Sequence, residues 1–315
     1  MKIVRSFDDI ERDTSSIVTV GSFDGVHLAH REILREVVQR ARMREGRSVV
    51  VTFDPHPSEV VTSPRGRVGL LTTLGERIAL LEHLNIDILF VIDFTVEFSR
   101  LTPREFYQTY VVDRIGLSEV VVGYDHMFGR NREAGVRELV SMGQLFHFSV
   151  FAAHPYVLEG VTVSSTEIRT MLLQGRVERA ALFLTYPYFL TGKVVPGDGR
   201  GKSIGYPTAN IQPLSTRKIA PGRGVYLVGA ELRGRQYFGM MNIGLRPTVS
   251  NGMDEKLEVH IFDLKEEIYG EKITIMFLRR LRDEQKFSSI QDLMGQLAKD
   301  KEVSLKHIPQ YKRQL

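Results

Sequence analysis

The sequence predicts an α/β domain with a mainly parallel sheet, followed by an antiparallel β-barrel with a terminal helix. Over residues 17–175, short apolar runs alternate with helical patterns, as in strand–helix–strand units. Over residues 189–277, β-rich segments are separated by glycine and proline with no helical pattern between them. A chain of 315 residues can bury two cores, and we place the domains at 1–183 and 184–315.

Local patterns predict the elements of the first half. The apolar residues 17–20 indicate a buried strand, and the pattern that follows places Ile33, Leu34, Val37, Val38 and Ala41 on one helix face. Thr102 begins a later helix as its N-cap, with Glu105 completing a capping box, and Gly116 ends it. We expect further strands at 48–53, 87–93 and 119–122, and a helix at 73–84.

The second half is expected to contain β-strands before one last helix. Their segments are short, rich in β-branched and aromatic residues, and bounded by turn residues. We expect strands at 189–195, 224–230, 237–243, 257–263 and 272–277, and a helix at 288–299.

Composition narrows the class of protein. The chain is 43% hydrophobic and 25% charged, as in ordinary globular proteins, and it has no cysteine for disulfides, thiolate–zinc sites or thiol catalysis. No apolar run approaches the roughly 20 residues of a membrane span, and the first residues show no apolar leader. The net charge of +4 comes from scattered basic residues. We expect a cytoplasmic protein that binds neither membranes nor nucleic acid.

The first motif is the run VGSFDGVHLAH at residues 20–30. It places His27 and His30 in the first turn of a helix that begins directly after a strand. Backbone N–H groups and the positive end of the helix dipole suit this position to a phosphate chain. Two alternatives remain open: surface histidines that cap a helix, and a zinc site that would need a third ligand.

Three further motifs lie in the first half. TFDPHP at 52–57 and GYDHMFG at 123–129 directly follow predicted strands, as the histidine motif does. Ligands of parallel sheets bind outside the carboxyl ends of the strands, so we expect one shared site. VSSTEIR at 163–169 combines hydroxyls with an arginine one turn into a helix, although Ser164 and Glu167 alone would also make an ordinary capping box.

Two motifs lie in the second half. GKSIGYPTAN at 201–210 is no Walker A loop, because Pro196 stands where that loop needs glycine and Gly205 and Pro207 oppose a following helix. In LEVHIFD at 257–263, alternation places Glu258 and His260 on the face opposite the apolar residues. Glu258 is either a catalytic base or an ordinary exposed glutamate of a half-buried strand.

Together, in this order, the motifs resemble those of bacterial bifunctional riboflavin kinase/FMN adenylyltransferases (FAD synthetases) across nearly the whole chain. The family patterns are GxFDGxHxGH, TFxPHP, GxDFxFG, SSTxIR, G(R/K)xLGxPTAN and LEvHilDf. This chain departs from them with Ala29 for glycine, His126 for phenylalanine and Lys202 for the commoner arginine. The resemblance implies a Rossmann-like nucleotidyltransferase domain followed by a riboflavin kinase barrel.

The resemblance also implies roles for individual residues. Glu258, His27, His30 and Arg169 would be catalytic, and Thr208 and Asn210 would hold the metal. The flavin would contact Phe53, Pro55, His56, Pro57, Phe128, Asn242 and Arg282. The nucleotides would contact Gly21, Phe23, Asp24, Gly25, His27, His30, Asp125, Ser164, Ser165, Thr166, Arg169, Gly201, Lys202, Gly205, Pro207, Thr208 and Asn210.

The activity that the resemblance implies is FAD synthesis in two steps. Riboflavin is phosphorylated by ATP to FMN, and FMN is adenylylated by a second ATP to FAD and pyrophosphate. Mg²⁺ would accompany ATP, the flavins would be substrates and products rather than bound cofactors, and oligomers are compatible with this reading. Two alternatives remain: a member of the family with one working activity, and a non-catalytic flavin-sensing or RNA-binding regulator.

Overall fold

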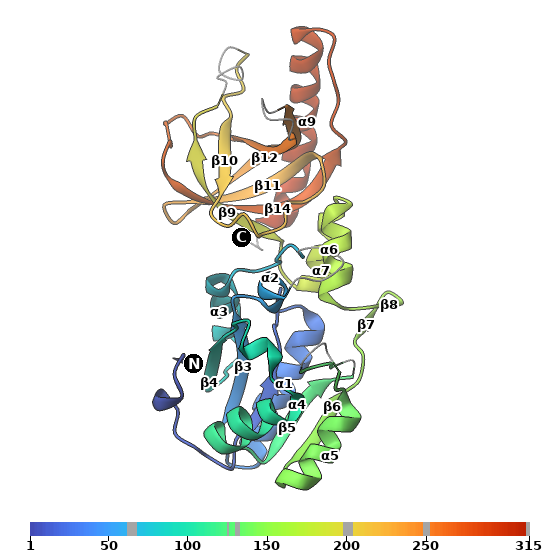
Figure 1. The fold of residues 1–315 in the computed structure, drawn as a ribbon. Coiled ribbons are helices and arrows are strands. Elements are labelled where there is room, and N and C mark those ends of the chain that lie inside the picture. Colours follow the sequence, from blue (N-terminus) through green and yellow to red (C-terminus); the bar gives the residue numbers. More distant parts are fainter. Residues whose placement is uncertain (62–67, 125, 130–132, 198–203, 248–252, 313–315) are drawn as a thin grey trace. The chain divides into compact units, whose positions relative to one another are not determined.

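The computed structural model describes residues 1–61, 68–124, 126–129, 133–197, 204–247 and 253–312 (Figure 1). These residues form two compact units, Met1–Ser165 and Thr166–Leu315. The predicted boundary after residue 183 falls at the end of helix α7 (Val177–Leu184), and it stays a prediction.

In the described part of the first unit, six strands form one parallel sheet in the order β1-β4-β3-β2-β5-β6. This confirms the predicted α/β class. From β2, chain order runs outward through β3 and β4 on one side and through β5 and β6 on the other, while β1 lies at the edge beside β4. The sheet therefore has a switch point between β2 and β5, where such folds bind ligands. The strands are β1 (Lys2–Val4), β2 (Ile17–Val20), β3 (Ser48–Asp54), β4 (Ile88–Asp93), β5 (Glu119–Gly123) and β6 (Ser149–Ala153).

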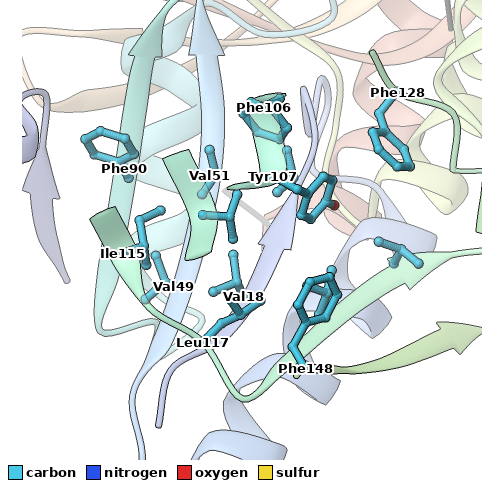
Figure 2. Close-up of a cluster of buried hydrophobic side chains, with 14 of the residues drawn as sticks. Val18, Val49, Val51, Phe90, Phe106, Tyr107, Ile115, Leu117, Phe128 and Phe148 are labelled. Atoms are coloured by element: carbon cyan, nitrogen blue, oxygen red, sulfur yellow. The ribbon is translucent and has the colours of Figure 1, made fainter. Parts of the chain in front are cut away.

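The sheet is buried on both faces because alternate residues of its strands enter different cores. Val49 and Val51 of β3 pack with aromatic residues of η3 (Phe106–Ile115), as Figure 2 shows for Phe106 and Tyr107. Val50, between them, belongs to the opposite core with residues of helices α1 (Leu28–Met43) and α3 (Leu74–Glu82). Burial on both faces explains why the strands are continuous apolar runs.

The helices of this unit agree with the prediction where their ends carry caps. Thr102 and Glu105 form the expected capping box of α4 (Pro103–Glu105), and η3 continues it, wound as a π-helix, up to Gly116. The prediction did not include the π winding, β1, β6 or α5. The remaining elements are η1 (Phe7–Asp9), α2 (Pro57–Val60), η2 (Phe98–Arg100), α5 (Val136–Phe146), β7 (Val157–Leu158) and β8 (Val161–Thr162).

The described strands of the second unit form a closed antiparallel barrel in the order β10-β13-β12-β11-β14-β9, closed by the pairing of β9 with β10. This confirms the predicted barrel, and closure leaves no exposed sheet edge. Helices α6 (Ser165–Leu173) and α7 precede it. The strands are β9 (Phe189–Val195), β10 (Ala209–Pro213), β11 (Gly224–Leu232), β12 (Arg235–Pro247), β13 (Met253–Ile261) and β14 (Lys272–Arg282).

Helix α9 (Ile290–Tyr311) lies alongside the barrel (Figure 1) and is longer than the predicted helix at 288–299. Tertiary contacts hold the additional turns. Ile308 is buried against barrel residues, and the Tyr311 hydroxyl donates to the Leu278 carbonyl oxygen at 3.2 Å. Among the described residues, no helix is both long enough and apolar enough to span a membrane.

Candidate functional site

The loop between β2 and α1 is a tight turn held from several sides. Phe23, Gly25 and Val26 have φ angles of 47°, 87° and 40°, and the Val26 N–H donates to the Phe23 carbonyl oxygen at 3.0 Å. Positive φ is uncommon for phenylalanine and valine, and such backbone is found where the surrounding structure enforces it. This loop leads directly into the first turn of α1.

His27 caps helix α1 with its own side chain. Its Nδ1 accepts from the His30 N–H at 3.3 Å, so a neutral His27 ring carries its proton on Nε2. The two imidazoles are stacked with centroids 3.6 Å apart, and the His30 ring also lies edge-on to Phe23 at 5.2 Å. His27 is therefore a helix cap, as one of the open alternatives expected, but its side chain is buried rather than on the surface. The stack places both rings together at a helix N-terminus.

Asp24 is fully buried, and its carboxylate accepts hydrogen bonds from protein groups. The Leu71 N–H lies 3.1 and 3.0 Å from its two oxygens, and Oδ1 also accepts from the Thr72 N–H at 2.8 Å and hydroxyl at 2.9 Å. The Gly25 N–H donates to the same Thr72 hydroxyl at 3.0 Å. These contacts anchor the loop, and nucleotide binding by Asp24 stays a prediction.

The motif at 163–169 meets the histidine loop through Ser165. Its hydroxyl donates to the Asp24 carbonyl oxygen at 2.9 Å, although the two residues are 141 positions apart. The structure thus brings together two motifs that the sequence placed in one site. Ser164 is half-buried in the first unit, whereas the exposed Thr166 and the half-buried Arg169 lie on α6 in the second unit.

The residues predicted to contact the flavin pack against other aromatic rings or lie at the start of a short helix. Phe53 packs edge-on against Phe94 at 5.4 Å, and Phe128 lies 5.0 Å from the buried Tyr107, whose pKa is raised by burial. His126, where the family usually has phenylalanine, stacks on Phe128 at 5.2 Å, so this position still carries a ring. His56 caps α2, the short helix that begins at Pro57; Pro55 precedes this cap and is exposed.

A cavity of about 380 Å³ opens beside this segment, near the carboxyl end of β4. No local sequence pattern indicated this cavity, because its walls come from separate elements of the first unit. Apolar and charged side chains line it, among them Phe7, Phe90, Phe98, Tyr110, Arg5 and Asp93.

The barrel aligns three predicted residues across neighbouring strands. Glu258 of β13 is paired with Asn210 of β10 on one side and with Asn242 of β12 on the other. Directly paired residues of antiparallel strands project from the same face, so a carboxylate lies between two amides. Lys256, which the sequence reasoning missed, forms an ion pair with Glu258 at 2.8 Å. An i, i+2 spacing on a strand was the available signal.

Asn210 is closely confined. It is 8% exposed, and its Nδ2 has no hydrogen-bond partner among the described residues. A Cβ at Gly197 would lie 1.8 Å from this Nδ2, so a larger residue there would force the amide to move. The amide is thus confined on the side of Gly197, and no described residue accepts a hydrogen bond from its Nδ2.

His260, which the sequence placed on the same strand face as Glu258 but without a role, holds the segment before Thr208. Its Nδ1 lies 2.8 Å from the Pro207 carbonyl oxygen, and Tyr206 packs edge-on against its ring at 5.3 Å. Because a carbonyl oxygen only accepts, Nδ1 is the donor, and burial holds the pKa of His260 below its usual value. Thr208 itself is exposed, as are Gly205 and Pro207.

Arg282 joins β14 to α9 rather than pointing freely from the barrel. Its Nε lies 2.9 Å from Asp300 Oδ2, and a second guanidinium nitrogen lies 2.8 Å from the same oxygen. Flavin binding by Arg282 stays a prediction. Asp125, Gly201 and Lys202 lie outside the described residues. Among those that are described, no group of three or more histidine, aspartate or glutamate side chains is arranged to hold a metal.

Comparisons with known proteins match both halves. A family model described as FAD synthetase matches residues 9–167, and one described as riboflavin kinase matches residues 184–308. The bifunctional riboflavin kinase/FMN adenylyltransferase of Listeria monocytogenes is 35% identical over 290 residues, covering 92% of this chain and 91% of that protein. This chain belongs to the bifunctional riboflavin kinase/FMN adenylyltransferase family.

Two further relatives extend the match to nearly the full length. The protein of the same name from Bacillus subtilis is 34% identical and covers 94% of each chain. The crystal structure of a macrolide-efflux protein from Streptococcus pneumoniae has a TM-score of 0.85 and 33% identity, covering 96% of this chain and 98% of that one. Family membership confirms the resemblance that the motifs indicated.

Proposed function

We propose that this chain makes FAD from riboflavin in two ATP-dependent steps, with one site in each of the predicted domains, 1–183 and 184–315. The main support is that each family match covers one half of the chain and that each half contains one of the two sets of candidate catalytic groups. The first unit contains the histidine pair at a helix N-terminus, and the second contains the Asn210–Glu258–Asn242 row. Riboflavin, FMN and ATP are the proposed substrates, and the absence of cysteine suits the reducing cytoplasm.

Phosphorylation of riboflavin needs a base because the attacking group is a neutral alcohol. We assign this role to Glu258, which takes the proton of the ribityl 5′-hydroxyl as the hydroxyl oxygen attacks the γ-phosphorus of ATP. The bond from the γ-phosphorus to the β-phosphate oxygen breaks, and ADP leaves. The ion pair with Lys256 at 2.8 Å holds the carboxylate in one position. Asn210 and Asn242, on either side, provide amides toward the phosphates and the flavin.

The phosphates of ATP need a hard cation, and the residues present fit Mg²⁺. Thr208 and Asn210 supply a hydroxyl and an amide carbonyl, which are oxygen ligands that Mg²⁺ accepts. The confined Asn210 amide, with an Nδ2 unpaired among the described residues, suits one ligand atom on the metal and one donor on a phosphate. Bound Mg²⁺ would neutralise phosphate charge.

Adenylyl transfer has different requirements, because the FMN phosphate is already an anionic nucleophile. It attacks the α-phosphorus of ATP, the bond to the β-phosphate oxygen breaks, and pyrophosphate leaves. The site needs donors rather than a base, and we assign His27, His30 and the N-terminus of α1 to the triphosphate. Ser165, Thr166 and Arg169 are proposed to bind the departing phosphates.

Flavin chromatography tests the proposal. We expect wild-type protein to convert riboflavin to FMN and FAD with ATP and Mg²⁺, and supplied FMN to FAD. Glu258→Gln should abolish only the first conversion, and His30→Gln should abolish only the second. Glu231→Gln, an exposed glutamate of β11, and His83→Gln, an exposed histidine after α3, are matched controls that should keep both. Absence of both products from the wild type would refute the proposal.

A further inference from the structure

Arg77, on α3, is a buried charged residue for which the proposed reactions so far give no reason. It is 1% exposed, and one of its terminal nitrogens donates to the Thr52 hydroxyl at 2.9 Å and to the Phe53 carbonyl oxygen at 3.2 Å. Burial lowers the pKa of the guanidinium, while the charges of Asp24, Asp54 and Glu59 oppose that shift. A buried charge is costly unless it is paired, so packing alone does not explain arginine here.

Thr52 connects Arg77 to the loop between β2 and α1 through hydrogen bonds. Its hydroxyl accepts from Arg77 and donates to the Ser22 carbonyl oxygen at 3.3 Å. Thr52 ends the buried part of β3, directly before the predicted flavin segment, and Ser22 lies in the loop that leads to His27. The chain Arg77–Thr52–Ser22 therefore connects the flavin side to the triphosphate side.

The segment directly before Arg77 also contacts this loop, at the Asp24 carboxylate. Residues 71 and 72, just before α3, bind the Asp24 carboxylate with two backbone N–H groups and one hydroxyl. Residues 71–77, which we call the brace, thus contact the loop at Asp24 and the end of β3 at Thr52. Because α3 begins at Leu74, just after the residues that bind Asp24, the two attachments limit the distance between the parts they hold.

We propose that Arg77 is a positioning residue for adenylyl transfer, which keeps the flavin-side end of β3 in register with the loop that binds the triphosphate. The proposal rests on the proposed function. Attack on the α-phosphorus requires the FMN phosphate and ATP to be in line, and a misplacement of about 1 Å costs on the order of 100-fold in rate. Arg77 touches neither substrate in this account; it acts through Thr52 and Phe53.

Four variants test it: Arg77→Met, Arg77→Lys, Thr52→Val and, as a control, Arg35→Met, an exposed arginine of α1. FAD formation from FMN gives kcat and KM, and riboflavin phosphorylation by the same protein is the internal reference. We expect Arg77→Met to lower kcat for FAD formation about 100-fold with a smaller change in KM, and to leave phosphorylation unchanged. Arg77→Lys should restore part of the rate, because it keeps the charge but loses the fork.

The outcomes separate clearly. Unchanged kcat for FAD formation in folded Arg77→Met would overturn the proposal, as would a loss that only follows the fraction of folded protein. If Arg77→Met does not fold, Thr52→Val decides: a lower kcat for FAD formation supports the proposal, and an unchanged kcat refutes it. A wild type that makes FMN but no FAD would instead refute the proposed adenylyl transfer itself, and this inference with it.

Discussion

Replacing Asp24 by asparagine separates a structural role from nucleotide binding. Asp24 Oδ1 accepts from three donors within 3.1 Å, two backbone N–H groups and the Thr72 hydroxyl. A hydrogen bond to a charged group is worth about 1 kcal/mol more than a neutral one, so removing the charge should cost about 3 kcal/mol over the three. The second oxygen becomes an NH₂ group that faces the Leu71 N–H, which adds to the loss.

The assay is calorimetric unfolding together with FAD synthesis. For a unit of this size, 1 kcal/mol corresponds to about 2–4 °C in Tm, so Asp24→Asn should lower the transition of the first unit by about 6–12 °C. Riboflavin phosphorylation should be unchanged. Asp113→Asn, an exposed aspartate of η3, is the control and should not shift the transition.

A different pattern would contradict this reasoning. If Asp24→Asn kept the wild-type Tm but raised KM for ATP in FAD synthesis, Asp24 would be a nucleotide ligand, as the resemblance implied, and the anchoring role would be refuted.

Three more predictions concern the second unit and the metal. Gly197→Ala places a Cβ where the Asn210 amide lies, so kcat/KM for riboflavin phosphorylation should fall at least about tenfold while FAD formation from FMN persists; equal activity would contradict the confinement of Asn210. Chelation of divalent cations by EDTA should stop both conversions, and Mg²⁺ should restore them. Burial lowers the pKa of His260, so the unfolded chain binds a proton at a higher pH than the barrel does. The stability of the barrel should therefore fall as pH drops below about 6.5. In a pH series of unfolding measurements, His260→Gln should weaken that dependence.

Local patterns predicted the helices and strands whose ends are marked by capping or turn residues. The capping box of Thr102 and Glu105 was found as expected, and Gly116 ends the helix with a φ of 75°. The apolar run at β2 and the barrel segments were also found near their predicted ranges. In each case the signal lies within a few residues of sequence, where propensity and periodicity are informative.

Long-range contacts account for what the sequence could not provide. The sequence alone indicates an ordinary arginine on an amphipathic helix at position 77. Only the fold places Arg77 beside Thr52, 25 positions away. His260 lies two residues from a predicted catalytic residue, yet its partner, the Pro207 carbonyl oxygen, is 53 positions away in the sequence. Helix α9 extends beyond its predicted end because Tyr311 is hydrogen-bonded to the barrel.

The central claim is that each predicted domain, 1–183 and 184–315, contains one complete and separate active site, and a mixing experiment tests it most directly. Glu258→Gln alone should leave riboflavin unconverted, and His30→Gln alone should stop at FMN. A mixture of the two variants with riboflavin, ATP and Mg²⁺ should produce FAD, because FMN released by one variant is adenylylated by the other. If the mixture forms FMN but no FAD, although the Glu258→Gln variant still adenylylates supplied FMN, the claim of two separate sites is contradicted.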